Sequence, residues 1–388
     1  MSLYSPPARQ GWSLAIVIGS VSVIGINNGM ITPLIALRAE AAGVSTTWNG
    51  VLAAIPSLAI LLLGVFFPLT IRKLGMLQSF YLSTALAVVG TLLFPLFSNY
   101  WAWLLLRFAM GAFLGLQWVV SESWINSLAS GSRRGTILGI FASFFSGGLA
   151  LGPLVLSFVG SEGYLPFAVC SALLIVCGLP LPLAQRPQAG GDGDLPLSII
   201  STLRTAPSEN FAGFINGASW GTQLSLLPLY AIHSGAEPGR ALQLLTGMCV
   251  GSLACQPVVG RLIDRFSPAH VLTVCGAAQL VICAVLAQSI ASDMAIWPLV
   301  FAWGAAVGGM YTAGLAGLGS KFAANDLPAA STGFTMVWEV GALCGPAIAG
   351  IAMQAWDPHG LAVVLAALGG FLLLASLRTG PVLTREPM

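Results

Sequence analysis

Three charged residues lie inside long apolar stretches, where a charge is costly: Arg107, Glu122 and Glu339. A charge at the centre of a membrane helix costs about 2.5–3.5 kcal/mol on insertion scales, so each should face protein or water. Desolvation disfavours the anion, so an isolated carboxyl at such depth can take up and release a proton. We predict that Glu339 and Glu122 couple protons. The alternative for Glu339 is a neutral acid that is hydrogen-bonded to a neighbouring helix.

Two of these charges share one apolar stretch with an aromatic residue. Trp118 precedes Glu122 by four residues and Arg107 precedes Trp118 by eleven, so on a helix the three lie near one face. Gly111 and Gly115 fall between them and are predicted to leave open space. An Arg, an aromatic and an acid along one groove suit a partly anionic or zwitterionic solute. The alternative is that Arg107 and Glu122 form structural pairs with other helices.

Neutral polar side chains near the middle of other apolar stretches are candidates for hydrogen bonding to a solute. Asn27 and Asn28 lie near the centre of the first stretch, and Asn216, Trp220 and Gln223 lie at the matching place in the seventh. The alternative is hydrogen bonding between helices, worth about 0.6 kcal/mol each. The predicted substrate-binding residues are Asn27, Asn28, Arg107, Gln117, Trp118, Asn216, Trp220, Gln223 and Tyr311.

The composition shows what must hold these residues. Of 388 residues, 56% are hydrophobic and 7% are charged, which is 28 residues (15 Lys+Arg and 13 Asp+Glu). A soluble domain carries about a quarter charged residues, and a disordered chain needs high charge and low hydropathy. The net charge of +2 has no basic stripe behind it, so no nucleic-acid partner is expected. An all-α integral membrane protein remains.

A helix needs about 20 apolar residues to cross a bilayer. Twelve stretches meet this length, and charges and turn residues separate them. The first is too long for a secretory signal core and is not expected to be cleaved. The predicted spans are 12–37, 48–71, 76–97, 101–127, 136–160, 163–184, 208–232, 241–263, 269–290, 295–320, 328–354 and 359–379.

The basic residues predict the orientation, because Lys and Arg accumulate in cytoplasmic loops. With the N-terminus inside, 12 of the 15 basic residues lie on the cytoplasmic side. Only Arg38 and Arg240 lie outside, and Arg107 falls within a span. An even number of spans then puts both termini in the cytoplasm.

The two halves of the chain repeat one another. The segment 33–38 (PLIALR) aligns with 228–233 (PLYAIH), an offset of 228 − 33 = 195. Gly111 aligns with Gly304, and Gly148 with Gly341, each at an offset of 193. Half of 388 is 194, so the chain is predicted to be a duplicated unit of six helices. Because six is even, the repeats are parallel, with a cavity predicted between them.

These features resemble the major facilitator superfamily over essentially the whole chain. The family's loop signature, G-x-x-x-D-R-x-G, is recognisable at 260–266 (GRLIDRF). In the first half, 68–75 (PLTIRKLG) has Arg72 where the family has an acid, which puts the usual loop latch there in doubt. The helix-4 pattern is present as Arg107 and Gly111. The segment from Leu106 to Ser123 is similar to a bacterial subgroup whose substrates are mostly unassigned.

The resemblance implies two pseudo-symmetric six-helix bundles, expected at 1–184 and 208–388 with a cytoplasmic linker at 185–207. It also implies that helices 1, 4, 7 and 10 line the cavity. Small-x-x-x-small patterns such as Gly25/Gly29 predict close helix packing along which the halves can rock. The residues expected to serve the conformational change are Gly152, Pro153, Asp264, Arg265, Gly345 and Pro346.

Enzyme and cofactor motifs carry little weight here. The match to G-x-S-x-G at 217–221 lies inside a predicted span, and that motif needs a strand-to-helix turn and a His partner. No phosphate-binding G-x-x-x-x-G-K-[ST] occurs. The seven cysteines are odd in number and lie in apolar stretches without C-x-x-C. We therefore expect no enzymatic activity, no cofactor and no metal.

The sequence as a whole predicts a secondary active transporter for a small organic solute. It is expected to work as a monomer in the bacterial inner membrane, with protons as the coupling ion and export slightly favoured. The alternatives are a proton-coupled uptake symporter, a uniporter or a Na⁺-coupled carrier. A further alternative is a non-transporting sensor or assembly factor on the same scaffold.

Overall fold

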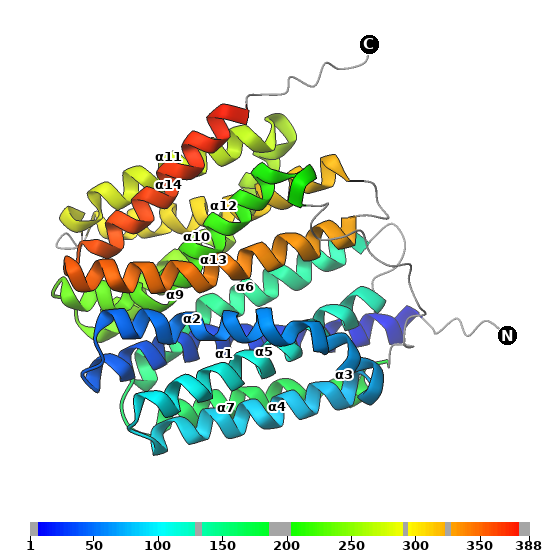
Figure 1. Ribbon diagram of the computed structural model, residues 1–388. Helices are drawn as coiled ribbons and strands as arrows, with labels where there is room; N and C mark the ends of the chain where they lie inside the picture. The colour runs from blue at the N-terminus through cyan, green and yellow to red at the C-terminus, as the bar shows by residue number, and fades with distance from the viewer. Residues whose placement is uncertain (1–6, 129–133, 186–202, 290–293, 323–326, 380–388) are drawn as a thin grey trace, which may run out of the picture. The chain divides into compact units, whose positions relative to one another are not determined.

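The computed structural model describes residues 7–128, 134–185, 203–289, 294–322 and 327–379, and within these ranges it contains helices and no strand. Figure 1 shows the helices in chain order. Their bounds are α1 (Pro7–Ala41), α2 (Thr46–Leu63), α3 (Phe67–Leu74), α4 (Met76–Leu93), α5 (Tyr100–Leu128), α6 (Arg134–Val159), α7 (Leu165–Gly178), α9 (Pro207–His233), α10 (Pro238–Arg265), α11 (Pro268–Ser289), α12 (Ile296–Lys321), α13 (Leu327–Ala355) and α14 (Gly360–Thr379), with short 3₁₀ helices η1 (Gly64–Phe66), η2 (Phe94–Leu96) and η4 (Leu181–Leu183).

The predicted spans coincide with these helices to within a few residues. Among the described residues, 11 helices are long and apolar enough to cross a membrane. The remaining predicted span, 208–232, is α9, which has 27 residues but is too polar to meet the same hydropathy criterion. The prediction of an all-α membrane protein is confirmed: eleven of the twelve predicted spans meet the criterion among the described residues, and a long helix, α9, stands at the twelfth.

The second span is not one regular helix. A 3₁₀ turn, η1, separates α2 from α3, and the apolar stretch continues through all three elements over Thr46–Leu74. Pro68 stands in the first turn of α3, where its missing N–H needs no helical partner. The span ends at Gly75, whose φ of 82° is a left-handed conformation that suits glycine.

The chain divides into two compact units, one of Met1–Val44 with Ile55–Gly193 and the other of Ser45–Ala54 with Asp194–Met388. The start of α2 therefore belongs to the second unit rather than to a continuous first bundle. Thr46 donates to the side chain of Gln354 at 3.2 Å there. Most of the expected linker, residues 186–202, lies outside the described residues.

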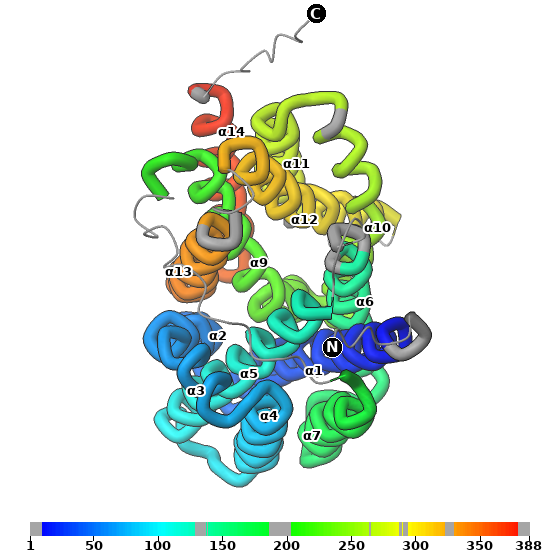
Figure 2. The backbone as a smooth tube through the Cα atoms, turned by 90° about the vertical axis from the view of Figure 1, so that its right-hand side faces the viewer, coloured from blue at the N-terminus to red at the C-terminus, as the bar shows by residue number. Residues whose placement is uncertain are grey.

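The two units pair their helices in the same way. In the first unit α1 packs on α6, and α4 packs on α5 and α7; in the second α9 packs on α13, and α11 packs on α12 and α14. Figure 2 looks along the helices and shows α11, α12 and α14 grouped together, as α4, α5 and α7 are in their own unit. This correspondence confirms the six-helix duplication that the sequence offset predicts.

Glycines allow the closest of these helix pairs. A Cβ on Gly25 or Gly29 of α1 would overlap the backbone carbonyls of Phe145 or Leu149 on α6. In the second unit, a Cβ on Gly217 of α9 would overlap the carbonyl of Trp338 on α13. Lipid tails are as apolar as the helices, so membrane helices associate through such close van der Waals packing.

Candidate functional site

The clearest candidate residues are two buried amides, one in each unit, to which the described residues supply no hydrogen-bond partner. Asn27 on α1 and Gln223 on α9 are both 0% exposed. Neither the nitrogen nor the oxygen of either amide has a partner among the described residues. A buried polar group left unpaired costs about 1–3 kcal/mol, so such groups point to a role beyond packing.

Asn27 and Gln223 occupy nearly equivalent places in the repeat. At the offset of 195, Asn27 corresponds to Thr222 (222 − 27 = 195) and Asn28 corresponds to Gln223 (223 − 28 = 195). Thr222 is also fully buried, and its hydroxyl has no partner within the described part of the chain. Asn28 is half-buried. Both copies of the repeat thus place buried polar groups that lack partners among the described residues at corresponding positions of their first helix.

A line of polar residues runs along α9. Glu209, Asn216, Gln223 and Tyr230 follow one another at seven-residue intervals and are all buried. Seven residues are about two helical turns, so these side chains share one face of α9. The polarity of this line explains why α9 is less apolar than the other spans.

Asn216 shows which neighbours this face meets. Its side-chain nitrogen donates to the backbone oxygen of Val307 on α12 at 2.6 Å. The indole nitrogen of Trp338 on α13 donates to its side-chain oxygen at 2.7 Å. Asn216 is therefore satisfied and joins three helices, so the structure favours the interhelical alternative for this predicted binding residue.

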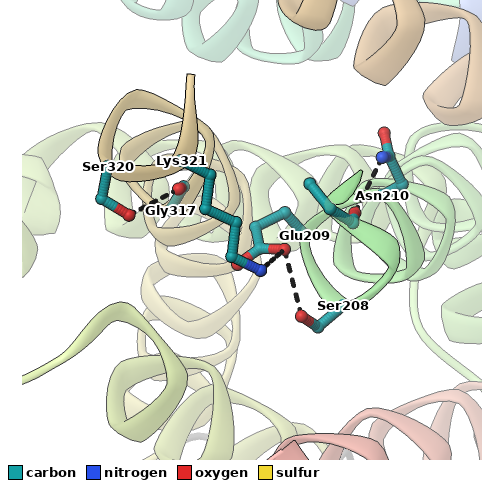
Figure 3. Close-up of polar contacts among 7 residues, drawn as sticks. Ser208, Glu209, Asn210, Gly317, Ser320 and Lys321 are labelled. Carbon is teal, nitrogen blue, oxygen red and sulfur yellow. Dashed lines mark hydrogen bonds and ion pairs between the residues drawn. The ribbon is translucent and has the colours of Figure 1, made fainter. Parts of the chain in front are cut away.

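An ion pair lies at the first turn of α9 (Figure 3). The ammonium of Lys321, at the end of α12, donates to Glu209 Oε2 at 2.7 Å, and the Ser208 hydroxyl donates to the same oxygen at 3.0 Å. Gly317 makes room for the carboxylate, because a Cβ there would lie 2.7 Å from Glu209 Cγ. The acid at a helix N-terminus and the cation at a helix C-terminus also suit the two helix dipoles.

Gln117, another predicted binding residue, is buried inside the first unit. Its side-chain nitrogen donates to the hydroxyl of Thr84 on α4 at 2.8 Å and lies 3.8 Å from the sulfur of Cys177 on α7. Its geometry therefore favours a role in joining α4, α5 and α7.

The open groove expected along α5 is not present. Pro56 of α2 packs directly against Gly111, and Ile60 of α2 packs against Gly115, so that no space for a solute is left beside either glycine. Trp118 instead packs on α6, with its ring centre 4.5 Å from that of Phe145. The expectation of open space was wrong, because the helical period predicts a shared face but not which neighbour covers it.

The three charges of the spans differ in exposure. Arg107 is buried in α5, Glu339 is half-buried in α13, and Glu122 is exposed on α5. Glu339 directly follows Trp338, whose indole holds Asn216 of α9, so the acid lies beside the α9–α13 contact. These positions leave the proton-coupling roles as predictions.

The remaining predicted binding residues are partly accessible. Trp220 is half-buried on α9. Tyr311 on α12 is 40% exposed, and its ring meets that of Phe334 on α13 edge to face, with the ring centres 5.6 Å apart.

Among the residues expected to serve the conformational change, the two glycines lie at close helix–helix contacts. A Cβ on Gly152 would lie 2.5 Å from the backbone of Gly29 and Met30 on α1. Gly345 would overlap the carbonyl of Ala218 on α9 in the same way. Pro153 and Pro346 lie inside α6 and α13. Arg265 is exposed at the end of α10, and the side chain of Asp264 lies outside the described residues.

Sequence reasoning missed two buried features. Trp303 on α12 is fully buried, and its indole nitrogen has no partner among the described residues. It lies fourteen residues, about four turns, before Gly317, which contacts Glu209, so it is on the side of α12 that faces α9. The Glu209–Lys321 pair was also missed, although seven-residue spacing from Asn216 and Gln223 would have indicated Glu209.

Comparisons with known proteins agree with this architecture. The family model described as Major Facilitator Superfamily matches residues 17–207 and 210–387. An uncharacterized MFS-type transporter of Yersinia pseudotuberculosis serotype O:3 (strain YPIII) is 27% identical over 314 residues, which cover 79% of this chain and 80% of that protein. The uncharacterized MFS-type transporter YfkF of Bacillus subtilis (strain 168) is 25% identical over 355 residues, covering 89% of this chain and 90% of YfkF.

Solved structures share the fold at low sequence identity. A bacterial homolog of the human lysosomal transporter Spinster, in an inward-facing and unoccupied conformation, matches with a TM-score of 0.76 and 16% identity over 96% of each chain. The nucleoside transporter NupG matches with a TM-score of 0.78 and 12% identity over 95% of this chain and 98% of its own. Taken with the family model, the duplicated helices and the buried polar residues, this establishes that the chain belongs to the Major Facilitator Superfamily of membrane transporters.

Proposed function

We propose that this transporter moves a small organic solute across the bacterial inner membrane by alternating access, coupled to protons. The unsatisfied amides of Asn27 and Gln223 are the observation that carries the proposal. Each is fully buried at a corresponding depth of its own repeat. A solute that hydrogen-bonds to either amide recovers the free energy that the burial of that amide costs.

The chemistry of the unpaired groups indicates what the solute offers. Amides, the Thr222 hydroxyl and the Trp303 indole are neutral, and an amide both donates and accepts hydrogen bonds. The solute is therefore expected to present neutral hydrogen-bonding groups. The aromatic side chains of Trp220 and Tyr311, which are partly accessible, suit an apolar portion of the same molecule.

Proton coupling is assigned to Glu339, with Glu122 as the second candidate. Glu339 lies next to Trp338, which holds α13 to Asn216 of α9. A change of charge there would alter the α9–α13 contact that positions Gln223. A ligand shifts a conformational balance only by its differential affinity for the two states, and protonating a half-buried acid supplies such a difference.

The experiment is transport in proteoliposomes under an imposed pH gradient, with and without Na⁺. The proposal expects the gradient to drive movement of the solute whether or not Na⁺ is present, and expects Glu339→Gln to lose the response. If Glu339→Gln transports and still follows the gradient, the proton role of Glu339 is wrong. A requirement for Na⁺ would replace the proton with another coupling ion.

The solute itself is best found by thermal shift. The purified protein would be screened against metabolites, siderophores and drugs, since a ligand at 100 times its Kd adds about 2.7 kcal/mol of stability. We propose export rather than uptake, and inside-out vesicles decide this by the direction of accumulation. Stable binding without flux in either direction would instead favour a sensor or assembly factor.

A further inference from the structure

A histidine at the end of α9 is paired with an aspartate, and the proposed transport function does not use this pair. His233 is the last residue of α9, and its Nδ1 lies 2.6 Å from Oδ1 of Asp357. Asp357 belongs to the short connection between α13 and α14, so the pair ties two segments of the second unit that are 124 residues apart. The side chains are 18% and 52% exposed, respectively, so protons reach them.

The first repeat also has a basic and an acidic residue at the positions that correspond to this pair, but its basic residue is an arginine. His233 corresponds to Arg38 (233 − 38 = 195), and Asp357 corresponds to Glu162 (357 − 162 = 195). Both copies therefore place a basic residue at the end of their first helix and an acid in the connection before their last helix. Arg stays charged at any physiological pH, whereas His changes charge near pH ~6.5. Only the second copy can respond to pH.

Several titratable and charged residues lie near His233 along the chain or in the same connection. On α9, Tyr230 lies one turn earlier, and beyond the following turn come Glu237 and Arg240 at the start of α10. In the α13–α14 connection, His359 packs its ring on Trp356 at 5.6 Å. The segment Ser45–Ala54, which packs with this unit, carries no charged residue. Among the described contacts, the Asp357 carboxylate is in hydrogen-bond contact with the ring.

We propose that His233 and Asp357 form a pH-sensitive latch that holds the end of α9 to the α13–α14 connection. The protonated ring donates a charge-assisted hydrogen bond to the Asp357 carboxylate and interacts favourably with the negative C-terminal end of the α9 dipole. The neutral ring keeps at most a weaker hydrogen bond. The stabilisation is therefore present below the ordinary histidine pKa of about 6.5 and is lost as the pH rises and the paired ring gives up its proton.

The latch acts on the helix that carries Gln223. By the predicted orientation, His233 lies at the outer face, so an acidic exterior would hold the end of α9 and a neutral exterior would release it. This consequence for transport rests on the proposed function. The latch itself does not, because it is defined by the contact within the second unit.

The test compares melting temperatures of the full-length protein in lipid nanodiscs at pH 5.5 and pH 8. We expect His233→Gln and Asp357→Asn each to lower the Tm by about 2 °C at pH 5.5 and to leave it nearly unchanged at pH 8. His233→Arg should remove this difference, because an arginine keeps its charge at both pH values. His359→Gln is the matched control, because it removes a histidine of the same connection without touching the pair.

Hydrogen exchange supplies a second measurement that does not depend on global melting. At pH 5.5, the 356–363 segment should exchange faster in His233→Gln than in wild type, and at pH 8 the two should agree. Reversing the pair, as His233→Asp with Asp357→His, should restore the wild-type pattern. Equal effects of His233→Gln at both pH values, or a loss of pH dependence in His359→Gln, would overturn the latch. Neither result depends on transport, so failure of the latch and failure of the proposed function are distinguishable.

Discussion

Removing the buried amide of Gln223 should increase stability and abolish solute binding. Replacing it with Leu removes a buried polar group without a partner, so Gln223→Leu should raise the stability of the ligand-free protein by about 1 kcal/mol. The same variant should lose the thermal shift that the solute produces. Melting curves of wild type and variant, with and without the solute found in the screen, measure both effects.

Asn216→Leu is the matched control on the same face of α9. Asn216 holds α12 and α13 through hydrogen bonds of 2.6 and 2.7 Å, so its loss leaves two partners unsatisfied. This variant should therefore lower the Tm. If Gln223→Leu is destabilised as much as Asn216→Leu, Gln223 is a structural residue and the binding role is wrong.

Neutralising Glu209 and neutralising Lys321 should destabilise the protein by different amounts, although the two residues form one ion pair. The side chain of Lys321 is 37% exposed, and that of Glu209 is 11% exposed. Glu209→Gln leaves a lysine that water can solvate and should cost about 1 kcal/mol. Lys321→Gln leaves a largely buried carboxylate that keeps the hydrogen bond from the Ser208 hydroxyl, and it should cost about 2 kcal/mol or more. Chemical denaturation of the two variants compares them, and equal costs would contradict the burial argument.

At the level of single residues, the candidate site was only partly predictable. Asn27 and Gln223 stood out because amides near the centre of a span are unusual, and the structure leaves both unpaired. Gln117 met the same criterion, yet it is bonded to Thr84 inside the first unit. Helical spacing places a residue on a face of its own helix. It does not specify the neighbouring helix, which depends on long-range packing.

The α1–α6 contact makes a sharp prediction about two glycines of one helix. Gly29→Ala would push a methyl group into the backbone of Leu149, which cannot rotate away, and should cost about 1–3 kcal/mol. Gly19 has nothing within 4 Å of the added Cβ, so Gly19→Ala should be neutral or slightly stabilising. Melting curves of the two variants provide the comparison. Similar destabilisation by both would show that the close contact does not matter.

Helices were the most predictable level of the structure. A bilayer demands about 20 apolar residues per span, which leaves little freedom for the boundaries. The more polar α9 was still recognised as one of the twelve long apolar stretches, and its segment 228–233 repeats the pattern of 33–38 in α1. The break between α2 and α3 was not predicted, since an apolar stretch with two prolines, Pro56 and Pro68, also fits a continuous span.

The distribution of basic residues predicts that both ends of the molecule face the cytoplasm. A reporter fused after residue 388, or an epitope placed before residue 7, should be accessible from the cytoplasmic side alone. The reason is the excess of Lys and Arg in the loops assigned to that side. Accessibility of the two ends from opposite sides would contradict the even number of spans.

Duplication was readable from the sequence because glycines and prolines recur at one offset, and the paired helices of each unit reproduce it. The membership of Ser45–Ala54 in the second unit was not readable. It depends on Gly50 approaching the backbone of Pro346 and Gly350, which are almost 300 residues away in the chain. Contacts of that separation leave no periodic pattern in either segment.

Solute-driven proton movement is the most direct test of the central claim. Wild type and Glu339→Gln would be reconstituted with a pH-sensitive dye inside the vesicles, and the solute found by thermal shift would be added outside. The account predicts a change of internal pH for wild type and none for Glu339→Gln, although the variant still binds the solute. Proton movement of equal size in both proteins, or binding without any flux in wild type, would contradict it.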